Sequence, residues 1–216
     1  MDLLFAFQEW PYAETFRISR SAKTNSELFT VYVRDGGFVG RGECGLLPQY
    51  GQTREDVAAA LHDAVDLLAA GATRADIATK VSNTSARNAL DCALWDLECQ
   101  RSGQTIWERT GVARKDAIEV DLTIGINPTA KMREDALAAF AKGFRILKLK
   151  ANQEDVLERV EAIAAACPGA SLIVDANEAW DIATLRPDSR DAAQWDHAGQ
   201  ARDHYHRSQP SHIARR

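Results

Sequence analysis

The chain has 216 residues, of which 45% are hydrophobic and 26% are charged, so it can bury one generous core or two modest ones. Its formal net charge of -5, with no basic cluster interleaved with aromatic residues, argues against a nucleic-acid-binding protein. This composition excludes a fibrous chain and indicates an ordinary globular protein.

The first 50 residues alternate short runs of β-forming residues with turn signals. The segment "MDLLFAFQEW" has five apolar residues in a row behind the acidic Asp2, so it lacks the basic start and long apolar core of a signal peptide. We interpret it as a strand. Asp35, Gly36 and Gly37 predict a hairpin turn within an antiparallel meander.

Two long helices are predicted next, over residues 53–71 and 85–103, and Thr53 is the expected N-cap of the first. Apolar residues of the second recur at steps of three and four, which gives one continuous face of small and branched side chains. These residues are Ala86, Ala89, Leu90, Ala93, Leu94 and Leu97. Strands followed by helices predict an α+β capping domain over residues 1–115.

The four cysteines give no disulfide or metal-binding pattern. Cys92 and Cys99 are seven residues apart on one predicted helix, about 10 Å along its axis, which is too far for a disulfide. Cys44 and Cys167 have neither CxxC nor metal-ligand spacing. We therefore expect free, mostly buried thiols and a cytoplasmic location. From the net charge and the N-terminal segment described above, we expect binding to neither nucleic acid nor membranes.

From residue 117 the pattern becomes strand, helix, strand, helix, strand. The strands are expected over residues 117–125, 144–150 and 171–177, and the helices over residues 129–143 and 153–168. The repeat is close to the ~30 residues per unit of a (β/α)₈ barrel. Because no GxGxxG or Walker A loop follows a strand, a nucleotide-binding doubly wound sheet has no support. Residues 116–185 therefore predict an incomplete barrel of about three strands.

Charged and polar side chains end these apolar strands. The two-residue period of a strand puts Lys148 and Lys150 on one face of the second strand, and Asp175 and Asn177 on one face of the third. Thr123 takes an equivalent place on the first strand. Faces that point into a barrel would gather these groups at its C-terminal mouth, where such barrels place catalytic residues. The alternative is that the lysines only reach solvent.

Three motifs in chain order, "ARNALDCALWDL", "KLK" and "DANEAW", resemble the enolase superfamily, in particular its muconate-lactonizing-enzyme subgroup. Within that subgroup, "GECGLLPQYGQT" and "ARNALDCALWDLECQRSGQTIWERTG" are similar to dipeptide epimerases of the L-Ala-D/L-Glu type. The resemblance covers residues 1 to about 185. It implies an isomerase with a Mg²⁺ cofactor and a small dipeptide substrate. A related racemase, cycloisomerase or succinylbenzoate synthase is the near alternative.

The resemblance also implies catalytic roles. A lysine base abstracts the proton alpha to a carboxylate, and Mg²⁺ holds the resulting enediolate. Lys150 would be this base, with Lys148 alongside it, and Asp175 would be the first of three carboxylate metal ligands. Repulsion from Lys148, about 6 to 7 Å away, is expected to lower the pKa of Lys150 from its ordinary value near 10.4.

Three substrate contacts are implied by the same comparison. Arg20 lies in the loop that closes over the distal end of the substrate in relatives, where it could pair with a glutamyl carboxylate. Tyr50 occupies the second such loop, and Thr123 faces the barrel mouth. The alternative for Arg20 is a solvated loop residue.

The sequence changes character after Leu185. Residues 186–216 contain four of the five histidines and no apolar periodicity, as expected of DNA read in a wrong frame, so we expect a frameshift and a disordered tail. A metal-binding tail of His204, His206 and His212 is the alternative. Since the family's remaining ligands and second lysine lie on later strands, we expect an inactive chain, or a noncatalytic fragment that oligomerises or aggregates.

Overall fold

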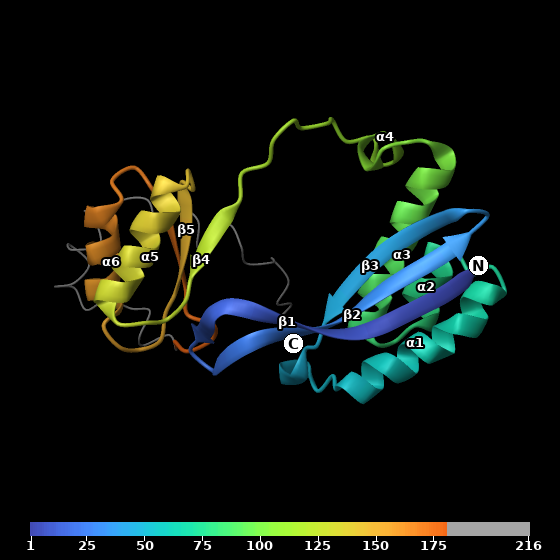
Figure 1. Ribbon diagram of the computed structural model, residues 1–216, viewed down its shortest axis with the longest axis horizontal. Coiled ribbons are helices and arrows are strands. Elements are labelled where there is room, and N and C mark those ends of the chain that lie inside the picture. The colour runs from blue at the N-terminus through green and yellow to red at the C-terminus, as the bar shows by residue number, and fades with distance from the viewer. Residues whose placement is uncertain (181–216) are drawn as a thin grey trace, which may run out of the picture. The chain divides into compact units, whose positions relative to one another are not determined.

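The structure is a computed structural model that describes residues 1–180, so the predicted tail over residues 186–216 lies outside it. The residues fall into two compact units, coloured along the chain in Figure 1. The first unit contains Met1–Ala13 and Asn25–Asp116, and the second contains Glu14–Thr24 and the described residues from Ala117 onward. The segment Glu14–Thr24, called the hairpin tip below, therefore belongs to the unit that follows it in the chain.

Three strands form the sheet of the first unit in the order β1-β2-β3. Their bounds are β1 (Asp2–Ile18), β2 (Ser21–Asp35) and β3 (Phe38–Gly45). The pairing of β2 with β3 is antiparallel, from Leu28 opposite Gly45 to Asp35 opposite Phe38. Gly36 and Gly37 form the predicted turn, and their positive φ angles of 55° and 90° are those that a tight hairpin turn requires.

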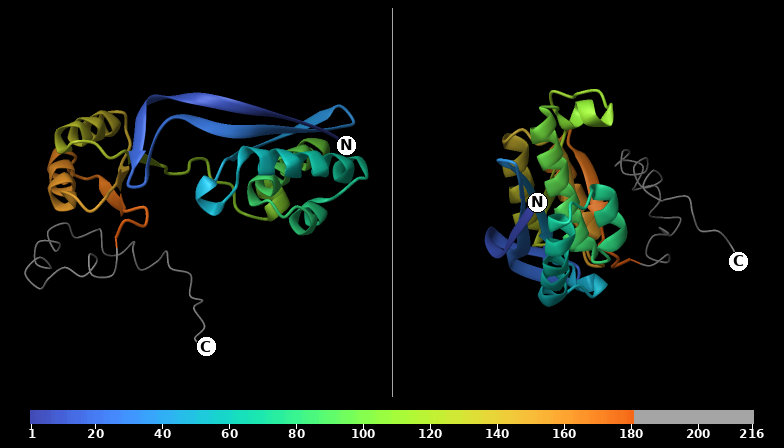
Figure 2. Two further views of the ribbon diagram at one scale, coloured as in Figure 1. Left: turned by 90° about the horizontal axis from the view of Figure 1, so that it is seen from below. Right: turned by 90° about the vertical axis from the view of Figure 1, so that its right-hand side faces the viewer.

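Helices lie on one side of this sheet, as Figure 2 shows. They are η1 (Pro48–Tyr50), α1 (Arg54–Ala69), α2 (Arg74–Lys80), α3 (Thr84–Ser102) and α4 (Ile106–Thr110). The Thr53 side chain caps α1 as predicted, because it accepts the backbone N–H of Asp56 while the Asp56 carboxylate accepts the N–H of Thr53. Asn83 caps α3 with a single bond, because its side chain accepts the N–H of Ala86.

Small residues allow β3 and α3 to approach closely. A Cβ atom added to Gly42 would lie 1.9 Å from the carbonyl oxygen of Ala89, and one added to Gly40 would lie 1.9 Å from that of Ala93. All six residues of the predicted apolar face of α3 are buried, which confirms that face. The two glycines thus set the distance between the sheet and its main helix.

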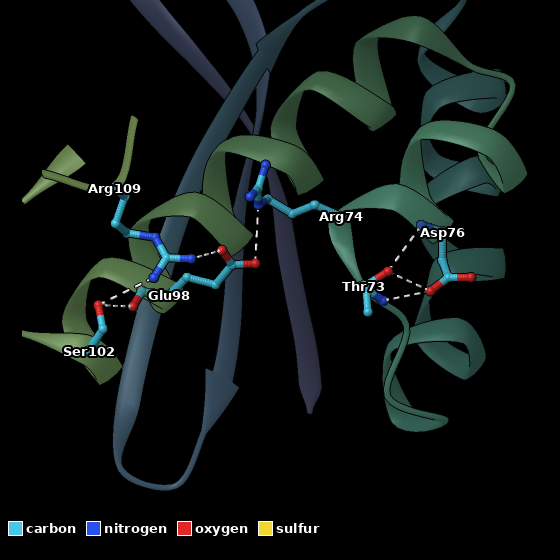
Figure 3. Close-up of polar contacts among 6 residues, drawn as sticks. All are labelled: Thr73, Arg74, Asp76, Glu98, Ser102 and Arg109. Atoms are coloured by element: carbon cyan, nitrogen blue, oxygen red, sulfur yellow. Dashed lines mark hydrogen bonds and ion pairs between the residues drawn. The ribbon is translucent and has the colours of Figure 1, made fainter. Parts of the chain in front are cut away.

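One carboxylate joins three helices of the first unit. Glu98 on α3 accepts from Arg74 Nε of α2 at 3.1 Å and from Arg109 Nη2 of α4 at 2.6 Å, as Figure 3 shows. The guanidinium carbon of Arg74 also lies 3.5 Å from the ring centre of Trp95, which is a cation–π contact. Because all three charged side chains are half-buried, the cluster orients the helices more than it stabilises them.

The second unit has the predicted strand, helix, strand, helix, strand order, with parallel strands β4, β5 and β6 as neighbours. The bounds are β4 (Asp121–Ile124), α5 (Thr129–Ala141), β5 (Ile146–Lys150), α6 (Val156–Ala166) and β6 (Ser171–Asp175). The fold is therefore the expected α+β unit followed by three strands of a barrel-type parallel sheet. No helix in residues 1–180 combines the length and apolar character needed to cross a membrane.

The parallel sheet has two different faces. Leu147 and Leu149 of β5 are buried in one core cluster with Met132 of α5 and Ile163 of α6. The residues that alternate with these along β5, and their partners in β4 and β6, form the other face, called the open face below. They are half-buried or exposed. These residues are Asp121, Thr123, Ile146, Lys148, Lys150, Ser171, Ile173 and Asp175.

All three strands are shorter than predicted, and the second, expected from residue 144, begins at Ile146. The first was expected over residues 117–125, yet Ile118 and Val120 are 63% and 62% exposed and precede β4. The reason is that β5 begins at Ile146, opposite Asp121, so the preceding residues have no partner strand. The third strand ends at Asp175, and Asn177 was wrongly placed in it, since its φ of 48° is incompatible with a strand.

All four cysteines are free, but the expectation that most are buried holds for only two of them. Cys44 and Cys167 are buried, Cys99 is half-buried and Cys92 is exposed on α3. Burial raises the pKa of Cys44 to about 11. The Cys44 thiol therefore remains protonated near neutral pH.

The glycine contacts of β3 predict the effect of Gly42→Ala. The added methyl group would meet the backbone of α3, so β3 and α3 must separate, and we expect a loss of about 1 to 3 kcal/mol in the free energy of unfolding. Gly45→Ala is the control in the same strand, because its nearest atom would be 4.0 Å away. Urea unfolding followed by circular dichroism measures both, and equal stabilities would contradict the close approach.

Candidate active site

Two lysines and one carboxylate meet on the open face of the parallel sheet. Asp175 Oδ2 lies 2.7 Å from Lys150 Nζ and 2.9 Å from Lys148 Nζ. The other oxygen of Asp175 accepts the backbone N–H of Asn177 at 2.9 Å. The sequence placed these three charged residues at one edge of the sheet, and the structure brings them into direct contact.

Strand pairing explains this contact. In the parallel register Lys150 stands opposite Asp175, and Lys148 stands one row below, between Thr123 and Ile173. Because both lysines share one face of β5, each can reach the same carboxylate. The Lys150 side chain is 11% exposed and that of Lys148 is 33% exposed, so Lys150 is the deeper of the two.

The environment of Asp175 favours its ionised form. Burial raises the pKa of this carboxyl, but hydrogen bonds from Lys150, Lys148 and the N–H of Asn177 outweigh burial and hold the pKa well below its usual range. Asp175 is therefore a carboxylate at neutral pH. Its negative charge lies between the two ammonium groups and offsets the mutual repulsion that we expected to activate Lys150.

The hairpin tip lies against the loop that follows β4. The backbone N–H of Ile126 donates to the carbonyl of Arg17 at 2.9 Å, and the Arg17 side chain donates to Asn127 at 3.5 Å. A Cβ atom on Gly125 would lie 3.4 Å from the backbone of Arg17, so the two chain segments touch through their main chains. On the same strand of the tip, an ion pair joins Glu14 of β1 to Lys131 of α5 at 3.2 Å.

The tip also contacts the loop that follows β6. Ser19 and Arg20 form the turn between β1 and β2, so Arg20 occupies a tight turn and not a long loop. Arg20 Nη1 lies 2.6 Å from Glu178 Oε2, and Ser19 Oγ donates to the carbonyl of Asn177 at 3.3 Å. The tip thus reaches the loops at the C-terminal ends of β4 and β6, called the rim below.

The loop after β6 is a turn with unusual backbone angles. The N–H of Ala179 donates to the carbonyl of Ala176 at 3.0 Å, and the two central residues, Asn177 and Glu178, have φ of 48° and 66°. These are angles of a type I′ turn, which Asn tolerates and Glu rarely adopts. Asn177 Oδ1 is buried and has no hydrogen-bond partner within residues 1–180.

A third set of contacts joins the loops after β5 and β6. Trp180 Nε1 donates to the carbonyl of Asn152 at 2.6 Å, and the Asn152 side chain accepts from Arg159 of α6 at 2.8 Å. Arg159 is one of two buried polar or charged residues of the described chain. These bonds fix the loop that carries Glu178.

Within residues 1–180, the remaining predicted residues, Thr123 and Tyr50, form no side-chain hydrogen bond or ion pair with the three-residue charge cluster of Lys148, Lys150 and Asp175. Thr123 is half-buried on the open face, opposite Lys148 in the register of β4 and β5. Tyr50 belongs to the first unit, ends η1 and is 71% exposed. The substrate-binding roles of both remain predictions. Sequence reasoning missed Glu178, because only the turn geometry turns its side chain toward Arg20.

Asp175 alone does not make a site for the Mg²⁺ that the resemblance implies. Residues 1–180 contain no group of three or more His, Cys, Asp or Glu side chains placed to hold a metal ion. Carboxylate oxygen suits Mg²⁺, but the ion requires six ligands and both oxygens of Asp175 already accept from lysines or a backbone N–H. The described residues therefore supply at most one ligand residue.

Removal of the Asp175 charge gives a testable pH dependence. Asp175→Asn leaves two ammonium groups without their carboxylate, and we expect a loss of about 1 to 3 kcal/mol in the free energy of unfolding at pH 7. Folding lowers the pKa of Asp175, so the contribution of its charge to the free energy of unfolding is complete above the unfolded-state pKa of about 4. This contribution decreases as the pH falls from there toward the lowered pKa of the folded state.

Urea unfolding of wild-type and Asp175→Asn chains between pH 3 and pH 7 measures this difference. The two chains should differ by a constant amount above about pH 5 and converge below about pH 4. Glu161→Gln is the matched control, since Glu161 is exposed on α6 and forms no ion pair within the described residues. A constant difference across the whole range would show that the Asp175 charge is not the cause.

Two family models match the sequence. Residues 2–111 match the mandelate racemase / muconate lactonizing enzyme N-terminal domain, and residues 131–197 match the enolase C-terminal domain-like family. The second match continues past Leu185, where the frameshift was expected. That expectation concerns residues outside the described chain and stays a prediction.

Individual relatives agree with these families. The L-Ala-D/L-Glu epimerase of Escherichia coli (strain K12) is 35% identical over 181 residues, which are 83% of this chain and 56% of the relative. A hydrophobic dipeptide epimerase of Roseobacter litoralis is 31% identical over 183 residues, 79% of this chain and 52% of the relative. The chain thus spans about half the length of these curated relatives.

Solved structures give the same result. An enolase family member from Agrobacterium tumefaciens with homology to dipeptide epimerases, which holds sodium and L-Ala-L-Glu, has a TM-score of 0.79 and 34% identity over 85% of this chain and 56% of its own. The dipeptide epimerase of Cytophaga hutchinsonii, complexed with Mg and D-Ala-L-Val, has a TM-score of 0.75 and 26% identity over 84% of this chain and 53% of its own. The chain belongs to the mandelate racemase / muconate lactonizing enzyme family of the enolase superfamily and is dipeptide epimerase-like.

Proposed function

We propose that the rim and open face of the second unit form one side of a dipeptide epimerase site, in which Lys150 removes the proton alpha to a carboxylate of the substrate. One observation carries this proposal. Lys148, Lys150 and Asp175 meet at the carboxyl ends of parallel strands, in a chain whose relatives include dipeptide epimerases. Barrel enzymes place their catalytic groups at this end of the strands.

The geometry suggests different roles for the two lysines. Lys150 is the more buried of the two and donates a hydrogen bond to Asp175 in the described arrangement. To act as a base it must lose a proton and turn away from that carboxylate. Lys148 is more exposed and contacts the same Asp175 oxygen, so it can balance the carboxylate charge while Lys150 reacts.

The charges favour an acidic dipeptide as the substrate. Arg20 on the hairpin tip, and Lys148 and Lys150 on the open face, are three cationic side chains at or near the rim. Cationic groups so placed suit a ligand with two carboxylates. L-Ala-L-Glu, which the Agrobacterium tumefaciens relative binds, is such a ligand.

Mg²⁺ enters this proposal only through Asp175. Several relatives, including the dipeptide epimerase of Cytophaga hutchinsonii, are complexed with Mg. We propose Asp175 as one oxygen ligand for that ion, which would supply positive charge near the reacting carboxylate. The other ligands would have to come from outside residues 1–180, since the described residues offer no cluster that holds a metal.

The 216-residue polypeptide by itself should not exchange the alpha proton of L-Ala-L-Glu in D₂O with Mg²⁺. The open face offers lysines from β5 alone and one carboxylate ligand, whereas epimerisation needs a proton donor on the opposite face of the alpha carbon. A chimera that adds the later part of the Escherichia coli relative after residue 185 should restore exchange. Proton NMR follows deuterium incorporation in both cases.

Within that chimera, Lys150→Met tests the base. Loss of a positioned base should lower exchange by about 10²- to 10⁴-fold. Lys142→Met is the matched control, because Lys142 is an exposed lysine at the end of α5. The chimera with Lys142→Met should exchange the alpha proton at the same rate as the unmodified chimera. Exchange by the 216-residue chain would refute its inactivity, and full exchange by the Lys150→Met chimera would remove Lys150 from the mechanism.

A further inference from the structure

We propose that Glu178 pairs with Arg20 in the ligand-free chain, at the position where the acidic side chain of a substrate would bind. Glu178 then competes with that side chain for Arg20 and thereby sets the substrate specificity. This inference rests on the proposed function, because it assumes that Arg20 binds an acidic dipeptide. Glu178 would be a specificity-determining residue that touches neither the reacting carbon nor Lys150. Its carboxylate would have to leave Arg20 before an acidic substrate could bind there.

The contact itself is the first argument. Arg20 Nη1 lies 2.6 Å from Glu178 Oε2, although the two residues are 158 positions apart in the chain. A glutamyl side chain of a substrate would present the same carboxylate to the same guanidinium. Occupation by Glu178 therefore lowers the affinity for an acidic side chain and leaves the affinity for a neutral one unchanged.

The backbone of Glu178 is the second argument. Its φ of 66° lies in the left-handed region, which non-glycine residues other than Asn and Asp rarely adopt. Asn177 at φ 48° tolerates the same region well, so the strain falls on Glu178. Such outliers persist where the surroundings over-determine them, and here the turn hydrogen bond of Ala179 and the ion pair with Arg20 do so.

The exposure of the pair makes the contact reversible. The Arg20 side chain is 45% exposed and that of Glu178 is 71% exposed, so water screens their attraction and a ligand can reach the guanidinium. The bond from Ser19 to the carbonyl of Asn177 does not involve the carboxylate and can remain when Glu178 leaves. When Arg20 changes partner, the tip loses only the small contribution of this ion pair and keeps its other contacts with the rim.

Hydrogen exchange of the full 216-residue chain tests the contact without a substrate. The amide of Ile126, which donates to Arg17 of the hairpin tip, reports whether the tip lies on the rim. Glu178→Gln and Arg20→Gln should each speed its exchange by roughly two- to fivefold, as loss of an exposed ion pair allows, and the double variant should add nothing further. Glu161→Gln, the same charge change on α6, should leave the rate unchanged. An unchanged rate in Glu178→Gln would overturn the proposal.

Binding tests the competition separately. NMR titration of L-Ala-L-Glu and L-Ala-L-Gln into wild-type and Glu178→Gln chains should show roughly two- to fivefold tighter binding of the acidic dipeptide by the variant, and equal binding of the neutral one. Equal gains for both dipeptides, or none, would overturn competition while the proposed function stands. If neither dipeptide binds to any chain, the proposed substrate class and the competition fail together, whereas the hydrogen-exchange result still decides the contact.

Discussion

Parallel pairing in register is the constraint on which the second unit depends. Because β4, β5 and β6 run in the same direction, their carboxyl ends reach one edge of the sheet, and the loops that follow them all lie at that edge. The register sets Lys150 opposite Asp175. Because side chains alternate along β5, Lys148 lies on the same face as Lys150. A slip of one residue would turn both lysines into the core that Leu147 and Leu149 now occupy.

Each unit places one carboxylate between two cations, with different chemical consequences. Glu98 lies between Arg74 and Arg109, and guanidinium groups stay protonated at any physiological pH, so that cluster can only orient helices. Asp175 lies between Lys148 and Lys150, and an ammonium group can release its proton. The choice of lysine over arginine is therefore what the proton transfer proposed for Lys150 requires.

The sequence allowed prediction of features that depend on periodicity. The buried face of α3 and the shared face of Lys148 and Lys150 follow from residue spacing alone, and both are present in the structure. Features set by neighbouring chain segments were missed. The position of Asn177 depends on where β6 loses its partner strand, and the contact of Glu178 depends on a turn that a strand pattern does not encode. The bridging of both lysines by Asp175 also needed side-chain geometry.

The hairpin tip gives the second unit a discontinuous sequence, and this affects the order of folding. Residues 14–24 are synthesised more than a hundred residues before β6, yet their contacts with Asn177 and Glu178 complete that unit. Closing so long a loop costs conformational entropy. Because β1 and β2 are anchored in the sheet of the first unit, that sheet presents the tip as a turn already formed. The contacts of the tip with Asn177 and Glu178 can therefore form only after both of these distant segments have been made.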